Sequence, residues 1–542
     1  MRTFSLLALA LGFLAAAVWP ASRVHAQDAA PTPLMPAQGL YWNPDEPGIF
    51  HQVSVGPGGF LFVLIAHFEA GGEPTYLTLQ GYFEPSSLDD WASTREIGSL
   101  RSPLLRKEGG QCLGCPWRPA RTVLSGLGDA ELLFFEDGRA EFRGPFGVAP
   151  LERFPLFTAD PSDGAWLGGP WLVGRFGAEA RLGIVMVESE ATPFGIGDSS
   201  GHRFTDVDAG VHPLIPDIIG RRLVPTGFQG FDIKSILGLR AGQLIVSHAE
   251  LHERNQRMIG RGRVTQPPSK DELIMLHLDG ARVGTSRLAH AWLPSQGLYY
   301  VRGELGNYLH VAVGPDGRVF ATLSTFRADG EPTFLTLEGA YQPTTREAFG
   351  SGPEIGRISG PLLRLSGGAC LGCPHRTPQA IDAGLGTATL VFDMHGRAAL
   401  SWQGGSMALE RYPLYTRQQD APEARYQGRW LLVRTRFDST EFAFVELEAP
   451  AAAPVDTPHP LDWNAGYPIR CTECSPRLRQ LLHSLELRTL IQGGLRIDGG
   501  PHGHVYRAHD RDGIVLAEKP WGTSTGLARP ENDRIVLIPF PE

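Results

Sequence analysis

Long apolar runs are scarce in this sequence of 542 residues. After the N-terminal segment there is no stretch of about eighteen consecutive apolar residues, so we expect no transmembrane segment in the mature chain. An excess of basic residues is also lacking, since 49 Lys and Arg stand against 58 Asp and Glu. A chain with a net charge of −9 has no electrostatic match to a phosphate backbone, so nucleic acid is not expected as a partner.

The N-terminal segment holds the long apolar stretch, from Phe4 to Trp19, and ends in small residues at Ala26. A basic start, an apolar centre and a small-residue exit are typical of an export signal. We therefore predict a signal peptide at 1–26, a flexible leader at 27–37, and a mature chain that is periplasmic or secreted. An uncleaved anchor is the alternative. No Cys follows the cleavage site, so a lipid anchor is not indicated.

Helix-favouring patterns are rare, and turn residues are abundant. The chain has 66 Gly and 44 Pro, with aromatic and branched residues between them. This composition is typical of many short strands joined by turns. We expect helix to be the minority structure.

The chain repeats itself at a constant offset of 258 residues. The matching segments are Gln38-Gly-Leu-Tyr41 with 296–299, Cys112-Leu-Gly-Cys-Pro116 with 370–374, and Leu151-Glu-Arg-Phe-Pro155 with 409–413. A match without gaps from 38 to 158, which includes turn glycines and prolines, indicates two copies of one folded unit and not a short solenoid repeat.

Each copy shows a similar succession of strands and turns. In the first copy, the strand-like segments 50–55 and 60–68 form a predicted hairpin, and 75–80 alternates apolar and polar residues. A polar excursion over 85–128 interrupts the predicted sheet, and 130–142 restores it as another hairpin. About seven antiparallel strands result, enough for a small barrel or sandwich.

These patterns predict a mainly β protein built by tandem duplication of an antiparallel β-barrel or sandwich unit, each followed by a smaller strand-rich subdomain with little helix. The predicted domains are the first β-domain at 38–160, its subdomain at 161–293, the second β-domain at 294–418 and its subdomain at 419–542. One capped amphipathic helix is expected from Ser475, on the spacing of Leu478, Leu481, Leu482 and Leu485.

All six cysteines lie in Cys-x-x-Cys pairs, which are Cys112 and Cys115, Cys370 and Cys373, and Cys471 and Cys474. In an exported chain each pair is expected to close a local disulfide. One alternative is a zinc site in which the two Cys-Leu-Gly-Cys turns supply four thiolates. Another is thiol redox chemistry at Cys471 and Cys474, because the predicted helix start would stabilise a thiolate there.

A cluster of histidines gives a second set of candidate ligands. His502, His504 and His509 lie close together in the sequence, and in an extended segment the first two would point to one face. Imidazoles in this arrangement can bind zinc or copper, so these three are candidate metal ligands. The alternative is a solvated hairpin, which the surrounding glycines favour, and on that interpretation the chain has no cofactor.

Two short resemblances add expectations. Gly197-Asp-Ser-Ser-Gly201 resembles the nucleophile loop of chymotrypsin-like serine proteases, and Ile65-Ala-His67 their histidine segment, which implies Ser199 and His67 as catalytic candidates. The loop departs from the family at Ser200, where the family has Gly. Separately, the Gly39-Leu-Tyr-Trp42 opening with Gly72-Glu-Pro-Thr-Tyr76 resembles uncharacterised exported proteobacterial β-domains, which implies export and a β fold but no activity.

The sequence favours an exported binding or structural protein whose partner is a protein, a glycan or an envelope component. An extracytoplasmic hydrolase or metal-dependent enzyme is one alternative, and an envelope thiol redox protein is another. Because the two Cys-Leu-Gly-Cys turns are shared by both copies, we interpret them as structural. Chemistry special to this chain is expected outside the matched part, at 197–201, 471–474 and 502–509.

Overall fold

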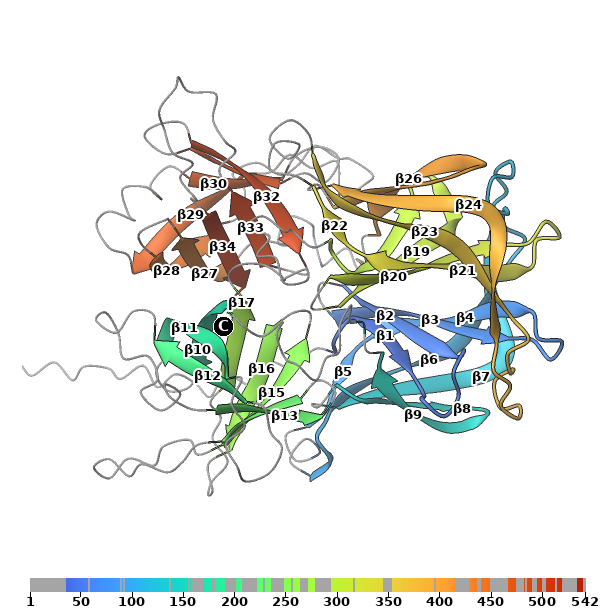
Figure 1. The fold of residues 1–542 in the computed structure, drawn as a ribbon, viewed down its shortest axis with the longest axis horizontal. Coiled ribbons are helices and arrows are strands. Elements are labelled where there is room, and N and C mark those ends of the chain that lie inside the picture. The colour runs from blue at the N-terminus through green and yellow to red at the C-terminus, as the bar shows by residue number, and fades with distance from the viewer. Residues whose placement is uncertain are drawn as a thin grey trace, which may run out of the picture. The chain divides into compact units, whose positions relative to one another are not determined.

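The computed structural model describes residues 36–156 and 294–414, with short gaps at 57–58, 88–89, 91–92, 136–137, 155, 315–316, 345–352, 394–395 and 413. From 169 to 277 and from 428 to 539 it describes the strands named below and little else. The described residues are almost all β-strand (Figure 1), with helix at a few positions such as Ser93, Thr94 and Leu482. The prediction of a mainly β, duplicated fold is confirmed.

The first copy forms one antiparallel sheet in the order β4-β3-β2-β1-β9-β8-β7-β6-β5. Its strands are β1 (Gly39–Trp42), β2 (Phe50–Val55), β3 (Phe60–Phe68), β4 (Pro74–Tyr82), β5 (Glu84–Pro85), β6 (Glu96–Glu108), β7 (Arg121–Phe135), β8 (Ala140–Gly144) and β9 (Gly147–Arg153). A further pairing of Thr78 on β4 with Leu105 on β6 joins the ends of the sheet. Eight strands thus close into a barrel, and β5 is an extra strand beside β6.

The second copy repeats this topology in the order β21-β20-β19-β18-β26-β25-β24-β23-β22. Its strands are β18 (Gly297–Val301), β19 (Glu304–Val313), β20 (Arg318–Phe326), β21 (Pro332–Ala340), β22 (Gln342–Pro343), β23 (Glu354–Ser366), β24 (Gln379–Asp393), β25 (Arg397–Trp402) and β26 (Gly405–Arg411). Thr336 pairs with Leu363 to close it, and these two residues lie 258 positions after the closing pair of the first copy.

The strand-rich segments that follow each copy are closed barrels as well. One consists of β10 (Gly169–Phe176), β11 (Arg181–Glu190), β12 (Gly201–Asp206), β13 (Arg222–Gly227), β14 (Gly230–Lys234), β15 (His248–Arg254), β16 (Arg257–Arg263) and β17 (Glu272–His277). The other consists of β27 (Gly428–Thr435), β28 (Thr440–Leu447), β29 (Gly466–Glu473), β30 (Leu485–Thr489), β31 (Leu495–Gly499), β32 (His504–Arg511), β33 (Ile514–Glu518) and β34 (Arg534–Pro539). Their closure was not predicted from the sequence.

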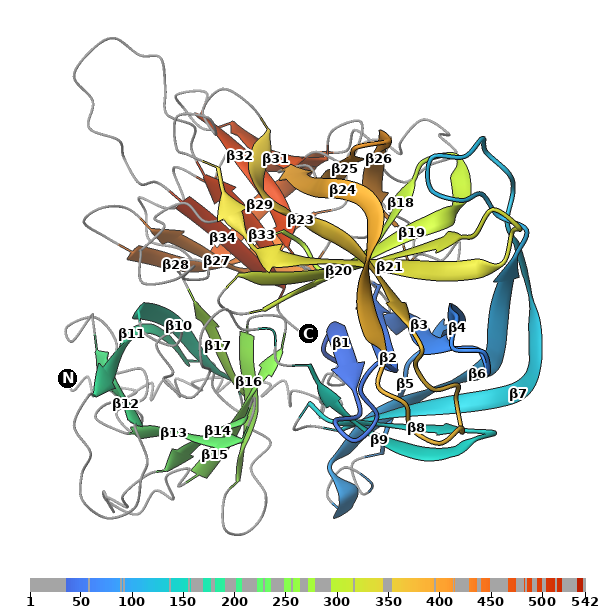
Figure 2. The ribbon, with the colours of Figure 1, turned by 45° about the vertical axis from the view of Figure 1, so that its right-hand side comes forward.

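Two local predictions need correction. The polar excursion over 85–128 does not interrupt the sheet, because it contains β6 and the first part of β7, which pair along most of their length (Figure 2). The sequences of these strands are polar because many of their side chains are exposed. The helix predicted from Ser475 to Leu485 is wrong at its end, since Leu485 begins β30; Leu482 is helical and buried against the core of that barrel.

Strand β3 is buried on both faces, which explains its nearly continuous apolar sequence. On one face, Leu61 and Ile65 pack in the core of the first barrel. On the other face, Leu64 packs in a cluster that includes Phe334 of the second copy, and Phe62 packs with Tyr308. The outer surface of the first sheet is therefore an interface between the copies.

Each copy also inserts a disulfide-closed turn into the other. Cys112 and Cys115 form a disulfide, as do Cys370 and Cys373, and the Cα atoms of each pair lie 5.2 Å apart. Within the first turn, Leu113 packs against the core of the second barrel. Its counterpart Leu371, in the second turn, packs against the core of the first barrel. The matched Cys-Leu-Gly-Cys turns therefore join the two copies.

Backbone contacts beside these turns follow the same reciprocal pattern. The Gly109 amide donates to the Gly330 carbonyl at 3.0 Å, and the Gly367 amide donates to the Gly72 carbonyl at 2.8 Å. A Cβ at Gly368 would overlap the ring of Phe68, as a Cβ at the equivalent position of the first copy would overlap Phe326. Glycine is required at both positions because an aromatic ring of the other copy occupies the space of a side chain.

We expect Leu371→Ala to lower the free energy of unfolding by about 1–3 kcal/mol, because it leaves a cavity in the core of the first barrel. Urea unfolding of the mature chain measures the change. Leu124→Ala is the control, since that leucine lies on β7 with 70% of its surface exposed and should change stability little. Equal losses in the two variants would show that Leu371 does not contribute to the core.

Candidate functional site

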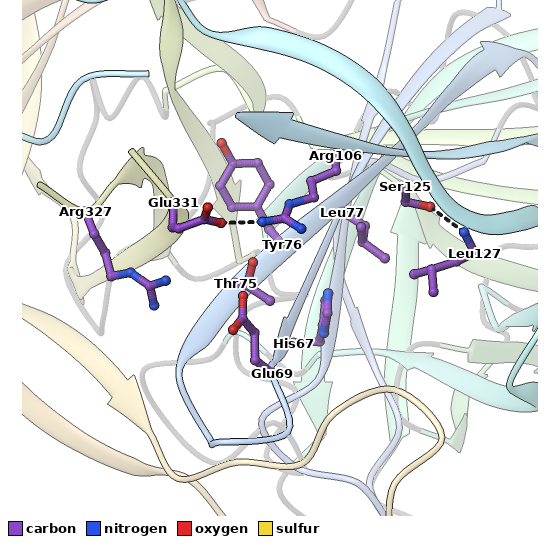
Figure 3. A pocket seen from close by; sticks show the side chains of 10 residues that line it. All are labelled: His67, Glu69, Thr75, Tyr76, Leu77, Arg106, Ser125, Leu127, Arg327 and Glu331. Carbon is purple, nitrogen blue, oxygen red and sulfur yellow. Dashed lines mark hydrogen bonds and ion pairs between the residues drawn. The ribbon is translucent and has the colours of Figure 1, made fainter. Parts of the chain in front are cut away.

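A pocket of about 500 Å³ lies where the first barrel meets the second copy. Its lining residues come from both copies and are His67, Glu69, Thr75, Tyr76, Leu77, Arg106, Ser125, Leu127, Arg327 and Glu331 (Figure 3). The first copy contributes strands β3 and β4, with the turn between them, and the long strands β6 and β7. The second copy contributes the turn between β20 and β21. A volume of this size suits a small-molecule ligand.

The β3–β4 hairpin sets the direction of the lining residues. His67 pairs with Thr75, and two residues earlier on β3 Ile65 pairs with Leu77. Residues two apart on a strand share a face, so His67 and Thr75 lie on the face that Ile65 and Leu77 present to the barrel core. His67 thus lies at the end of the first barrel, where its interior opens into the pocket.

The imidazole ring of His67 is neutral, and its Nε2 atom is a hydrogen-bond acceptor. Its Nδ1 lies 3.0 Å from the backbone carbonyl oxygen of Phe68, and because a carbonyl only accepts, Nδ1 is the donor. Burial lowers the pKa of His67 from 6.5 to about 4, with the carbonyl contact opposing the shift. The ring is therefore uncharged at neutral pH. Nε2 keeps its lone pair, is shielded from solvent, and has no hydrogen-bond partner among the described residues.

A second histidine lies deeper in the same barrel. His51 pairs with Ile65 and is 2% exposed, and its ring lies 5.1 Å from that of Phe142 in the barrel core. Neither of its ring nitrogens has a hydrogen-bond partner among the described residues. Burial, followed by the electrostatic effect of His67, lowers the pKa of His51 from 6.5 to about 3. The second copy has Leu309 and Thr325 at the positions equivalent to these two histidines.

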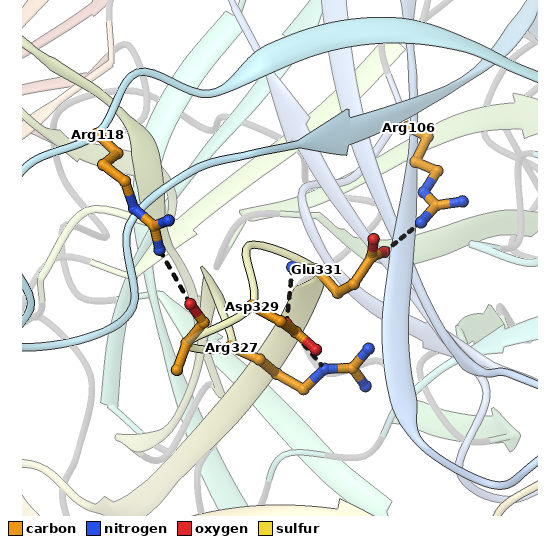
Figure 4. Close-up of polar contacts among 6 residues, drawn as sticks. Arg106, Arg118, Arg327, Asp329 and Glu331 are labelled. Carbon is orange, nitrogen blue, oxygen red and sulfur yellow. Dashed lines mark hydrogen bonds and ion pairs between the residues drawn. The ribbon is translucent and has the colours of Figure 1, made fainter.

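Charged side chains from both copies meet at the turn between β20 and β21 (Figure 4). Arg106 on β6 forms an ion pair with Glu331. In the same turn of the second copy, Arg327 Nε lies 3.6 Å from the Asp329 carboxylate. Arg118 donates from Nη2 to the Ala328 carbonyl at 3.2 Å. The β20–β21 turn is therefore fixed to the first copy by two arginines.

The predicted metal ligands are described only in part. The four cysteines of the two Cys-Leu-Gly-Cys turns are paired locally in disulfides, so the four-thiolate zinc site is not formed. His504 and His509 lie on β32, where they pair with Gly499 and Leu516, and His502 lies outside the described residues. No group of three or more His, Cys, Asp or Glu side chains suited to a metal occurs in the described part of the chain.

The remaining candidates are only partly described. Cys471 is disulfide-bonded and its Sγ lies 3.7 Å from the Phe444 carbonyl, while Cys474 is outside the described residues. Ser199 is outside them as well, so the structure does not place it near His67. The predicted signal peptide and most of the leader also fall outside the description. Where the chain is described, it has no helix that is long and apolar enough to cross a membrane.

Of the residues that line the pocket, the sequence indicated only His67 as a functional candidate, because of its resemblance to a protease segment. Special chemistry was expected outside the matched part of the chain, but this pocket lies within the matched part. The pocket residues could have been found from differences in side-chain chemistry between equivalent positions of the two copies. His67, Glu69, Tyr76 and Ser125 correspond in the second copy to Thr325, Arg327, Phe334 and Ala383. Tyr76 and Ser125 have apolar counterparts, and His67 and Glu69 have counterparts of different chemistry, so these residues are candidates for a role that the fold does not require.

The buried histidines predict a pH dependence of stability. The pKa values of His51, His67 and His310 in the folded chain are about 3, 4 and 3. Because their unfolded pKa is near 6.5, unfolding takes up protons below that pH, and stability is lost as the pH falls from about 6.5 toward 4. Each such proton contributes a slope of about 1.4 kcal/mol per pH unit.

Urea unfolding at pH 7 and pH 5 measures this slope. Replacing each histidine by the residue that the other copy has at the equivalent position (H51L, H67T and H310Q) should reduce it. The exposed His375 provides the control, because H375T should leave the slope as it is. A slope that all three core substitutions leave unchanged would mean that these groups do not resist protonation in the folded chain.

No protein-family model, curated protein or solved structure matches this chain. The resemblance to exported proteobacterial β-domains therefore stays a prediction, and function has to be inferred from the residues of the pocket.

Proposed function

We propose that the chain is an exported binding protein, periplasmic or secreted, and that the pocket between its two copies is the ligand site. The observation that carries the proposal is the convergence of polar groups in one pocket of about 500 Å³, several of them at positions where the copies differ. Few, well-placed polar groups in a preformed cavity are what small-molecule sites present. Export is supported by the N-terminal sequence pattern and by the two local disulfides.

The local chemistry favours binding over hydrolysis at this pocket. In a catalytic triad the histidine bonds to an acid through one nitrogen and to a nucleophile through the other. Here Nδ1 of His67 is engaged by a backbone carbonyl. Ser125 Oγ accepts a hydrogen bond from the Leu127 amide at 3.2 Å, an interaction within strand β7. The described pocket therefore contains no serine–histidine pair.

The disulfides of the two Cys-Leu-Gly-Cys turns have a structural role. Leu113 and Leu371, within these turns, pack against the cores of the opposite copies. A disulfide that closes such a short loop keeps the turn in the shape that presents its leucine. A redox catalyst would instead need to release and re-form this bond, which would disturb both cores.

Thermal unfolding of the mature chain against a library of amino acids, short peptides, saccharides and carboxylates tests the proposal. At least one class should raise the midpoint temperature, because a ligand that binds the folded state alone stabilises it. His67→Thr should weaken that binding, because it replaces a side chain that lines the pocket by a smaller one. The substitution is compatible with the fold, since Thr325 occupies the equivalent position of the second copy.

His375→Thr makes the same chemical change at an exposed position outside the pocket and should bind as the unmodified chain does. Circular dichroism of both variants checks that the fold is retained. If no member of the library stabilises the chain, or if the ligands bind equally well to both variants, this pocket is not the binding site.

A further inference from the structure

The pocket brings together charges of both signs from the same turn in the two copies. Glu69 follows β3 in the first copy, and Arg327 follows β20 in the second copy. These two positions are related by the offset of 258 residues, and both line the pocket. In Figure 3, Arg327 lies toward one side of the pocket and Ser125 and Leu127 toward the other, and Glu69 lies between Arg327 and His67. Duplication has thus supplied one turn twice, and divergence has given it opposite charges.

The other two charges of the pocket neutralise each other. Arg106 and Glu331 form an ion pair across the two copies, so neither side chain demands a charged ligand. The other two charged residues that line the pocket are Glu69 and Arg327, which come from equivalent turns of the two copies. The charge preference of the ligand is therefore decided by Glu69 and Arg327.

The end of the pocket at Glu69 accepts hydrogen bonds. The Glu69 carboxylate has no hydrogen bond or ion pair with the residues that the structure describes. Beside it, the ring of His67 is uncharged and donates its Nδ1 proton to the Phe68 carbonyl, so it can offer only a lone pair. A carboxylate next to a neutral imidazole attracts an ammonium group, which a charged imidazole would repel.

The end at Arg327 donates hydrogen bonds. Arg327 Nε is buried and has no hydrogen bond in the described part of the chain. The Asp329 carboxylate lies 3.6 Å away, but the Asp329 side chain is 63% exposed, so this pair is screened by water and weak. A guanidinium binds a carboxylate through its planar fork, and the side chain of Arg327 lines the pocket.

We propose that the ligand is a small zwitterion, of the class of short peptides with free termini, bound with its ammonium group at Glu69 and its carboxylate at Arg327. This inference rests on the proposed binding function. The pocket has room for more than a single amino acid, at about 500 Å³, and the opposite charges of Glu69 and Arg327 in its lining suit a ligand that carries both charges.

A matched set of dipeptides tests the charges one at a time. L-alanyl-L-alanine is compared with its N-acetylated form, its C-terminal amide and the doubly capped form, by isothermal titration calorimetry with the mature chain. We expect the free dipeptide to bind, and each cap to weaken binding about tenfold or more, since each removes one charge-assisted hydrogen bond. Glu69→Gln should abolish the preference for a free amino group, and Arg327→Gln the preference for a free carboxylate.

Exchanging the two residues separates recognition from structure. The single substitutions E69R and R327E each leave two like charges in the pocket and should weaken binding of the free dipeptide. The double variant E69R/R327E restores one charge of each sign, so the dipeptide binds in the reversed direction and affinity is recovered. If Glu69 and Arg327 affect only the stability of the fold, the double variant should not recover the affinity for the free dipeptide.

The outcomes distinguish the two proposals. If a capped dipeptide or a saccharide binds as well as the free dipeptide and binding is sensitive to His67→Thr, the pocket is the site but its ligand is not a zwitterion. If the free dipeptide fails to bind while another member of the library binds, the proposal of a zwitterionic ligand is also wrong. If the free dipeptide binds and neither the pocket substitutions nor the exchange alters its affinity, both proposals fail for this pocket.

Discussion

The structure of the two copies depends on a reciprocal insertion of side chains. Leu113 of the first copy packs against the core of the second barrel, and Leu371 of the second copy packs against the core of the first. Apolar burial drives this exchange, and a disulfide keeps each inserted turn in its shape. Each barrel core is therefore covered in part by a residue of the other copy.

The pocket is a consequence of that exchange. The long strands that carry each inserted turn cross from one copy to the other, and Arg106 on such a strand reaches Glu331 of the second copy. This arrangement brings the β20–β21 turn to the open end of the first barrel, where His67 lies. A single copy would have the barrel end without the arginine of its counterpart. The duplication therefore created a site that neither copy forms alone.

Much of the β scaffold could be predicted, because turns and alternation are local properties. Strands β2 and β3 were predicted with their observed bounds, since a glycine turn separates two apolar segments. Strand β6 and the first part of β7 were missed, because their many exposed residues resemble those of a polar loop when the pairing partner is unknown. Of the pocket, only His67 was singled out, for a resemblance to a protease that places no other residue of the site.

The sequence alone determined the duplication and the mainly β fold, because each depends on residues close together in the chain or on a constant offset. It also predicted local disulfides, and the structure shows two of them. Tertiary structure decided what those features do. It placed Leu113 and Leu371 against opposite cores, left the imidazole of His67 neutral by burying it, and set Glu69 and Arg327 on one pocket. The contacts between the copies join residues such as Arg106 and Glu331 that are far apart in the chain, and no local pattern in a single chain records which of those residues meet.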